Sequence, residues 1–296
     1  MRQSFEPTPV EFKPSLRAIP PGLHFVSTPI GAARDITLRA LDVLAAADVL
    51  AAEDTRTLRH LMEIHGIAIG SRLLLSYHEH SGDSVLPRLI AALREGKIVA
   101  YASEAGTPLI SDPGFELARA VVAEGLPILA APGPCAAICA LTVSGLPSDR
   151  FLFAGFPPTS QSARRSFLEE LRPLQATLIF YESPKRVHAL LADLVACLGG
   201  TREAVVCREL TKKFEEISRG SLDVLAEAFL TRSPKGEIVV LVDRAKEVTA
   251  DAGTIEAALE RAMTEMTMKD AAAVVAEAFG LPRREVYQLA LKRQST

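Results

Sequence analysis

Short apolar runs alternate with longer amphipathic segments between residues 23 and 145. The short runs are rich in β-branched and aromatic residues, as strands are, and the longer segments have apolar positions at helical spacing. Such alternation favours βαβ units around a mostly parallel sheet. The predicted strands span residues 23–27, 49–53, 73–77, 97–103 and 127–133, and the predicted helices span residues 36–47, 55–66, 85–96, 115–125 and 135–145.

A second set of elements begins at residue 151 and contains more strand relative to helix, which favours a mixed sheet. Its predicted strands span residues 151–156, 176–183, 204–210, 215–220 and 236–243, and its predicted helices span residues 162–174, 184–200 and 221–230. We therefore predict two α/β domains, over residues 23–144 and 151–244. The linker between them covers residues 145–150, and Gly145 is expected to end the preceding helix.

The two ends of the chain depart from this α/β pattern. Residues 1–22 hold five prolines among polar residues, so we expect a mobile tail. Residues 252–296 show only helical periodicity and predict a small helical appendage, in which Thr267 and Asp270 resemble a capping box. The last helix is basic, which suits either a contact with RNA phosphates or a solvated helix face.

Composition and charge limit the function classes. The formal net charge of −3 gives no field that would draw the whole molecule to nucleic acid, so any RNA contact must use local basic patches. The four cysteines lack paired metal-ligand spacing and lie in apolar stretches, so we expect free thiols and no metal. No apolar run approaches the ~18 residues of a membrane span, and no signal core is present, so we expect a cytoplasmic protein.

Four polar or glycine-containing loops follow predicted strands of the first half. In open α/β sheets ligands bind beyond the carboxyl ends of the strands, so these loops are the candidate site. Each also has a structural explanation as a turn, a helix cap or a packing contact. The loops cover residues 27–31 (STPIG), 52–56 (AEDTR), 103–114 (SEAGTPLISDPG) and 131–137 (APGPCAA).

Two of these loops carry carboxylates. Asp54 is suited to cap the following helix, whereas Glu53 and Arg56 are available for substrate contact. Asp112, followed by Pro113, is expected to start the next helix as its cap. In the second half, residues 180–183, 207–210 and 235–237 hold two aromatic residues and three acids at similar strand ends, which fits a cleft between the domains.

Several common signatures are missing. The chain has no GxGxxG turn, no GxxxxGK[ST] loop and no HExxH motif. Taken in order, STPIG, AAEDTR, SEAGTPLISDPG, PGPCAAI, GLPSDRF, FYESPKR, CREL and KGEIVVLV resemble the ribosomal RNA small subunit methyltransferase I family. These enzymes are 16S rRNA cytidine 2′-O-methyltransferases of the tetrapyrrole methylase superfamily, and the resemblance runs from about residue 23 to residue 243.

The resemblance implies a homodimer whose two α/β domains hold S-adenosyl-L-methionine between them, without a metal. It implies a 16S rRNA substrate in the small ribosomal subunit, and neither DNA nor a membrane as partner. The family usually has aspartate where this chain has Glu104, which shifts that carboxylate. The cofactor residues implied by the matched motifs are Pro29, Gly31, Ser103, Glu104, Ala105, Gly106, Thr107, Pro132, Gly133, Ala136, Ala137, Tyr181, Glu182 and Gly236.

Methyl transfer depends mainly on aligning the acceptor oxygen with the methyl group, and a general base adds a smaller factor. The carboxylates that we consider for this role are Glu53, Asp54, Glu182 and Glu209. Basic residues near predicted loops and helix starts are candidates for RNA contact: Arg56, Arg59, Arg164, Arg165, Lys185, Arg186, Lys212 and Lys213. Two alternatives stay open, namely methylation of a tetrapyrrole or other small molecule, and a non-catalytic RNA-binding assembly factor.

Overall fold

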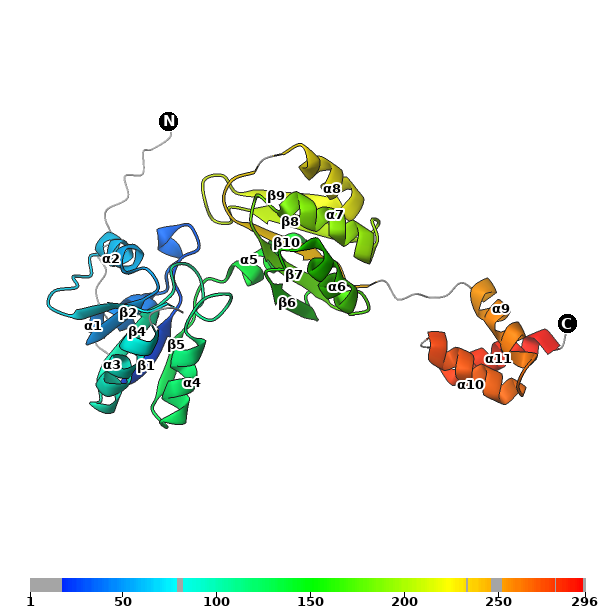
Figure 1. The fold of residues 1–296 in the computed structure, drawn as a ribbon, viewed down its shortest axis with the longest axis horizontal. Coiled ribbons are helices and arrows are strands. Elements are labelled where there is room, and N and C mark those ends of the chain that lie inside the picture. Colours follow the sequence, from blue (N-terminus) through cyan, green and yellow to red (C-terminus); the bar gives the residue numbers. More distant parts are fainter. Residues whose placement is uncertain (1–17, 79–81, 233, 246–251, 280, 295–296) are drawn as a thin grey trace, which may run out of the picture. The chain divides into compact units, whose positions relative to one another are not determined.

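The computed structural model describes residues 18–78, 82–232, 234–245, 252–279 and 281–294. The chain divides into two compact units, Met1–Arg244 and Ala245–Thr296 (Figure 1). The first unit holds both α/β halves. Most of the predicted tail lies outside the described residues, but Ile19 packs against the core and Gly22 begins the first strand.

The first half forms a five-stranded sheet in the order β3-β2-β4-β1-β5, with every pairing parallel. Helices α1 and α2 pack on one face of this sheet, and α3 and α4 pack on the other. The strands are β1 (Gly22–Val26), β2 (Val49–Ala52), β3 (Leu73–Ser76), β4 (Ile98–Ala102) and β5 (Ile128–Ala131). The helices are η1 (Ala33–Asp35), α1 (Leu38–Ala46), α2 (Thr55–Ile64), α3 (Gly82–Arg94) and α4 (Phe115–Ala123).

The second half forms a mixed sheet in the order β6-β7-β10-β8-β9, which confirms the sequence-based prediction. Strands β6 and β7 pair in parallel, and the other three pairings are antiparallel. The strands are β6 (Phe151–Gly155), β7 (Thr177–Glu182), β8 (Glu203–Arg208), β9 (Glu216–Ser221) and β10 (Ile238–Val242). Helices α6 (Gln161–Leu171), α7 (Val187–Leu198) and α8 (Leu222–Leu230) cover one face.

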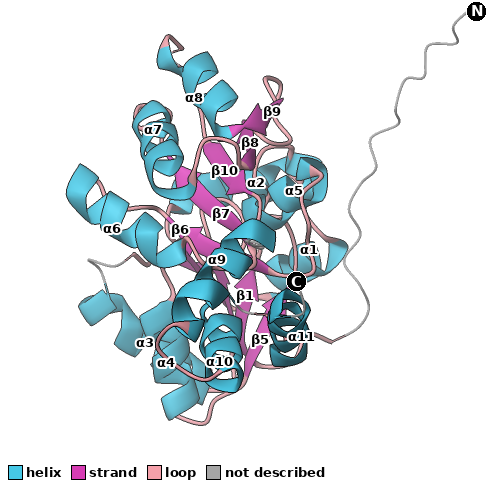
Figure 2. Ribbon diagram, turned by 90° about the vertical axis from the view of Figure 1, so that its right-hand side faces the viewer, coloured by secondary structure: helices cyan, strands magenta, loops and turns pink. Residues whose placement is uncertain are grey.

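Helix α5 (Ala136–Ser144) covers the other face of the second sheet, opposite α6 and α7 (Figure 2). Its buried residues pack on β7, β8 and β10, although the predicted boundary at residue 144 groups it with the first half. Gly145 ends this helix in the left-handed conformation, as expected. Because α5 follows β5 of the first sheet in the chain and packs on the second sheet, it connects the two halves.

The cap of α4 differs from the prediction, although the helix begins where its apolar pattern predicts. The helix begins at Phe115 with Gly114 as its cap residue, at φ 123°, and the side chain of Asp112 does not cap it. A Cβ at Gly114 would lie 3.2 Å from ring atoms of both Phe25 and Tyr101. The helix therefore begins at residue 115, where its apolar pattern begins, and Asp112 stays in the preceding loop.

The second unit is a three-helix unit of α9 (Ala252–Met263), α10 (Met268–Phe279) and α11 (Arg283–Gln294). Aliphatic residues of all three helices, among them Leu259, Val275 and Val286, form its small core. Thr267 Oγ1 accepts a hydrogen bond from the Asp270 N–H at 3.3 Å, so Thr267 caps α10 as predicted.

Candidate active site

A cavity of about 460 Å³ opens where strand-end loops of the two halves of the first unit meet. This volume is within the range of about 300–1,000 Å³ that is usual for small-molecule sites. The lining residues are Ile30, Glu53, Glu104, Ala105, Gly106, Thr107, Ile110, Ser111, Asp112, Cys135, Ala136, Phe156, Tyr181, Glu182, Ser183, Pro184, Gly236, Glu237, Ile238 and Val239. The wall thus combines aliphatic side chains with several carboxylates.

The loop that follows β4 is fixed to the loop that follows β1. The N–H groups of Thr28 and Gly106 each donate to the other residue's carbonyl oxygen, at 2.9 and 3.1 Å. Thr107 Oγ1 donates to the Pro134 carbonyl oxygen at 2.8 Å and accepts from Ser27 Oγ at 3.2 Å. Backbone and hydroxyl groups that the sequence offers for ligand contact therefore hold the cavity wall in shape.

Ser103 is the exception among these hydroxyl groups. It is 3% exposed, and its Oγ has no hydrogen-bond partner among the described residues. The Tyr101 hydroxyl, fully buried on β4, is likewise without a partner in the described chain. Buried polar groups are usually hydrogen-bonded, so two such hydroxyls behind one cavity are unusual.

Asp112 lines the cavity and belongs to the candidate site, which the sequence-based assignment as a helix cap missed. Burial raises the pKa of its carboxyl to about 6, and the charges of Glu53 and Glu104 add to this effect. Ser103 lies near enough to Asp112 to lower its pKa somewhat, although the Ser103 hydroxyl does not meet the geometric criteria of a hydrogen bond. Asp112 is therefore a carboxyl group that titrates near neutral pH inside a cavity.

Tyr181, at the end of β7, forms the wall on the side of the second half. Its hydroxyl oxygen accepts a hydrogen bond from the Ala137 N–H at 3.0 Å, in the first turn of α5. Its ring makes edge contacts with Phe153 and Phe156, at centroid distances of 4.8 and 5.6 Å. Phe156 is 54% exposed, so it presents an aromatic face at the cavity that the sequence analysis did not single out.

Among the carboxylates proposed from the sequence as bases, Asp54, Glu182 and Glu209 form ion pairs. Asp54 caps α2 and binds Arg56, whose hydrogen bonds lower the pKa of Asp54 to about 2. Buried Glu182 accepts from the Ser183 N–H at 2.6 Å and from Arg186 Nε at 2.7 Å. Glu53 lines the cavity, and its charge acts on Asp112 and Tyr101.

Glu209 accepts hydrogen bonds from two residues of the second half. Its Oε1 accepts from Lys212 Nζ and from the Glu237 N–H, both at 3.0 Å. Burial opposes the effect, but these hydrogen bonds hold the pKa of Glu209 below its usual value. A Cβ at Gly236, where φ is 95°, would lie 2.2 Å from the Glu209 carboxylate, so this glycine is required for the contact. Glu209 itself does not line the cavity.

The cofactor residues expected from the sequence fall into two groups. Seven line the cavity together with Glu182: Glu104, Ala105, Gly106, Thr107, Ala136, Tyr181 and Gly236. The others lie outside its wall: Pro29, Gly31, Ser103, Pro132, Gly133 and Ala137. Gly31 allows the loop after β1 to approach the second half, since a Cβ there would lie 2.5 Å from Thr211 Oγ1.

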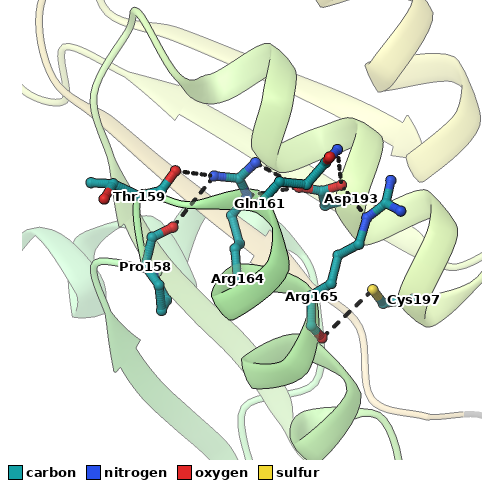
Figure 3. Close-up of polar contacts among 7 residues, drawn as sticks. All are labelled: Pro158, Thr159, Gln161, Arg164, Arg165, Asp193 and Cys197. Atoms are coloured by element: carbon teal, nitrogen blue, oxygen red, sulfur yellow. Dashed lines mark hydrogen bonds and ion pairs between the residues drawn. The ribbon is translucent and has the colours of Figure 1, made fainter.

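Arg164 was wrongly placed among the RNA-contacting residues. It is 4% exposed, and its guanidinium donates to Asp193 Oδ2 and to the carbonyl oxygens of Pro158 and Thr159 (Figure 3). A helical pattern does not reveal that a partner carboxylate on α7 lies opposite this arginine. The adjacent Arg165 is 49% exposed and binds Asp193 Oδ1 at 2.7 Å.

The other basic residues proposed for RNA contact differ in whether they form ion pairs within the protein. Lys212 is shared between Glu209 and Glu237, and Arg186 is bound to Glu182. Arg56 pairs with Asp54 but remains almost fully exposed. Arg59, Lys185 and Lys213 are exposed. The exposed members are the candidates that the structure leaves accessible for phosphate.

The described residues form a second hollow but no metal site and no membrane-spanning helix. A hollow of about 450 Å³ beside α2 is lined by Arg59, Glu63 and residues 66–70, away from the strand ends of the sheet. Within the described ranges, no group of three or more histidines, cysteines, aspartates or glutamates is placed to hold a metal ion. The described helices include none that is long and apolar enough to cross a membrane.

Comparison with known proteins identifies the family. The family model for tetrapyrrole (corrin/porphyrin) methylases matches residues 22–226, and a model for the C-terminal helix-turn-helix domain of the RsmI family matches residues 249–294. Ribosomal RNA small subunit methyltransferase I of Mesorhizobium japonicum is 45% identical over 281 residues, which cover 95% of each chain. The Escherichia coli O157:H7 protein of the same name is 42% identical, with 92% of this chain and 95% of that protein covered.

A solved structure supports the fold at lower identity. The uroporphyrin-III C-methyltransferase of Thermus thermophilus, complexed with S-adenyl homocysteine, is 17% identical and has a TM-score of 0.51. The match covers 74% of this chain and 96% of that chain. Since the family model spans more than half of the chain and the relatives match nearly all of it, the chain belongs to the ribosomal RNA small subunit methyltransferase I family of the tetrapyrrole methylases.

Proposed function

We propose that the protein transfers a methyl group from S-adenosyl-L-methionine to the 2′-oxygen of a cytidine ribose in 16S rRNA of the small ribosomal subunit. Its relatives carry the name ribosomal RNA small subunit methyltransferase I. The observation that carries the proposal is the cavity formed by strand-end loops of both halves. A cavity between two α/β layers is where such folds usually bind small molecules.

The lining fits the chemistry of this methyl donor. The donor has a positively charged sulfonium and an ammonium group, and the wall carries the carboxylates of Glu53 and Glu104. Two negative charges close together favour the binding of a cation. Burial is the main cause of the raised pKa of Asp112, and the charges of Glu53 and Glu104 add to it. The aliphatic part of the wall, which includes Ile110 and Val239, suits the apolar faces of an adenine ring.

The donor supplies an activated methyl group on sulfur when it is bound. The protein must chiefly hold the ribose oxygen in line with this group, and alignment of this kind contributes about 7–11 kcal/mol. Phe156 offers an aromatic face at the cavity for an unstacked base, which is how single-stranded RNA is commonly recognised. Exposed Arg59, Lys185 and Lys213 are available for phosphates.

We propose further that the protein acts in the cytoplasm as a homodimer. Phe115 and Val122 lie seven residues apart on α4, so both side chains lie on one face, and both are exposed. Exposed apolar side chains that share a face are typical of interfaces between subunits. Sedimentation equilibrium should give twice the chain mass, and a monomer at micromolar concentration would contradict this part.

Methyl transfer from labelled S-adenosyl-L-methionine tests the proposed function. The protein is incubated with unmodified small subunits, with free 16S rRNA and with a tetrapyrrole, and the methylated position is mapped by mass spectrometry. We expect label on one cytidine ribose of the assembled subunit. Label confined to the tetrapyrrole would assign the chain to small-molecule methylation, and an absence of transfer with retained RNA binding would indicate an assembly factor.

A further inference from the structure

Asp112 occupies a position that the fold does not explain by itself. It lies in the cavity wall on the loop between β4 and α4, and its side chain does not cap the helix that follows. Two residues of this loop, Leu109 and Ser111, have positive φ angles of 72° and 61°. Non-glycine residues rarely adopt this conformation, and such strain concentrates at functional sites. The strained loop places Asp112 in the cavity.

The surroundings of Asp112 include two hydroxyls without a partner. Ser103 Oγ is buried and meets no hydrogen-bond partner among the described residues, and the same is true of the Tyr101 hydroxyl. Both lie close enough to Asp112 to interact with its charge. Two buried donors beside one carboxylate can stabilise either of its charge states by small rotations of their O–H bonds.

The charged and titratable groups that face Asp112 come from three strands. Glu53 follows β2, Glu104 follows β4, Tyr101 lies on β4 and Tyr181 lies on β7. None of them is a cation, so the wall around Asp112 favours its protonated form. A carboxylate in such a setting takes up a proton more readily than one that is bound to arginine or lysine.

The other carboxylates considered as bases include three that form ion pairs. Asp54 and Glu182 are bound to arginines, and Glu209 is bound to Lys212. A carboxylate held by a cation is a weak base, because accepting a proton would break the ion pair. Asp112, in contrast to these three acids, combines a place in the cavity wall with surroundings that favour proton uptake.

We infer that the Asp112 carboxylate accepts the proton of the ribose 2′-hydroxyl during methyl transfer, an inference that rests on the proposed function. As the O–H bond breaks, its proton passes to Asp112, and the oxygen lone pair forms the new bond to the methyl carbon. The bond between this carbon and sulfur breaks with its electron pair remaining on sulfur, which becomes a neutral thioether. The proton then leaves Asp112 to solvent, so charge and atoms balance.

The test compares Asp112→Asn with wild type and with Asp223→Asn, a matched change at an exposed aspartate on α8. Single-turnover methylation of unmodified small subunits is measured from pH 5 to 9, and donor binding is measured by calorimetry. A general base typically contributes 10²–10⁴-fold, so we expect a rate loss of this size in Asp112→Asn with donor affinity within about threefold of wild type. Asp223→Asn should match wild type.

The pH profile separates a base from a structural residue. The wild-type rate should rise about tenfold per pH unit below pH 6 and level off above it, and Asp112→Asn should lack this limb. A thermal unfolding series over the same pH range gives a second readout, in which Asp112→Asn should gain stability relative to wild type above pH 6. This gain does not depend on activity.

Three outcomes would overturn the inference. One is a wild-type rate and pH limb in Asp112→Asn, which would leave the proposed function standing. Another is a rate loss fully explained by weaker donor binding, which would make Asp112 a binding residue. The third is failure of the wild-type protein to methylate any subunit, in which case the proposed function falls and the inference falls with it.

Discussion

The buried ion pair between α6 and α7 allows a quantitative test of the packing in the second half. Asp193 is fully buried and accepts hydrogen bonds from Gln161, Arg164 and Arg165 (Figure 3). Replacement of Asp193 by asparagine keeps the shape but removes the charge and turns an amide N–H₂ group toward arginine donors. The guanidinium of buried Arg164 would then lack its counterion.

The expected loss follows from the burial of the two partners. Removing one member of a buried pair typically costs about 3–5 kcal/mol, because the remaining charge is uncompensated. The half-exposed Arg165 provides the control, since a pair of this kind contributes about 0–1 kcal/mol. Arg165→Met should therefore lie close to wild type, although it removes a bond to the same carboxylate.

Urea unfolding of the full chain, followed by circular dichroism, measures both changes. The double variant Arg164→Met/Asp193→Leu should recover most of the loss, since an apolar replacement of a buried pair is often neutral. Burial raises the pKa of Asp193, but the three donors outweigh this and leave it below its usual value of 3.8. Stability from Asp193 is therefore present above pH 3.8 and lost as pH falls through the folded-state pKa. A loss below about 1 kcal/mol in Asp193→Asn at pH 7 would refute this reasoning.

Three further changes test the site. Gly236→Ala should weaken donor binding at least tenfold in calorimetry, because Gly236 lines the cavity and a Cβ there would clash with the Glu209 carboxylate. A donor affinity equal to that of wild type would contradict a role of Gly236 in the cavity wall. Tyr181→Phe removes the acceptor of the Ala137 N–H and should lower stability by about 1–3 kcal/mol in urea unfolding, and an unchanged midpoint would argue against the bond. Between pH 3.8 and about 6, the Asp112 carboxyl is protonated to a greater extent in the folded protein than in the unfolded chain, so its effect on stability becomes unfavourable as the pH rises. Asp112→Asn should therefore be about 1–2 kcal/mol more stable than wild type at pH 8. A loss of stability in this variant would contradict the raised pKa.

Local patterns were sufficient to predict most of the fold. Alternating strand and helix signals gave the order of the elements, and the larger share of strand in the second half gave the mixed sheet. These signals depend on burial of one face of each element, which leaves a periodic trace in the sequence. The sequence pattern did not show that α5 packs on the second sheet, because a helix that is apolar on all sides could pack on either sheet.

The errors at the site have a common physical cause. Asp112 and Pro113 have the local features of a helix start, but Gly114 occupies the cap position, where a Cβ would meet Phe25 and Tyr101. In the same way, an arginine on a helix does not reveal a buried partner on a neighbouring helix. Both features depend on contacts between residues far apart in the sequence, which local pattern and propensity do not record.

A crystal structure of the protein with S-adenosylhomocysteine tests the central claim most directly. We predict that this product lies in the 460 Å³ cavity, in contact with residues 104–107 of the first half and with Tyr181 and Gly236 of the second. Product bound instead in the hollow beside α2, or absent from crystals at a concentration that saturates binding in solution, would contradict the account.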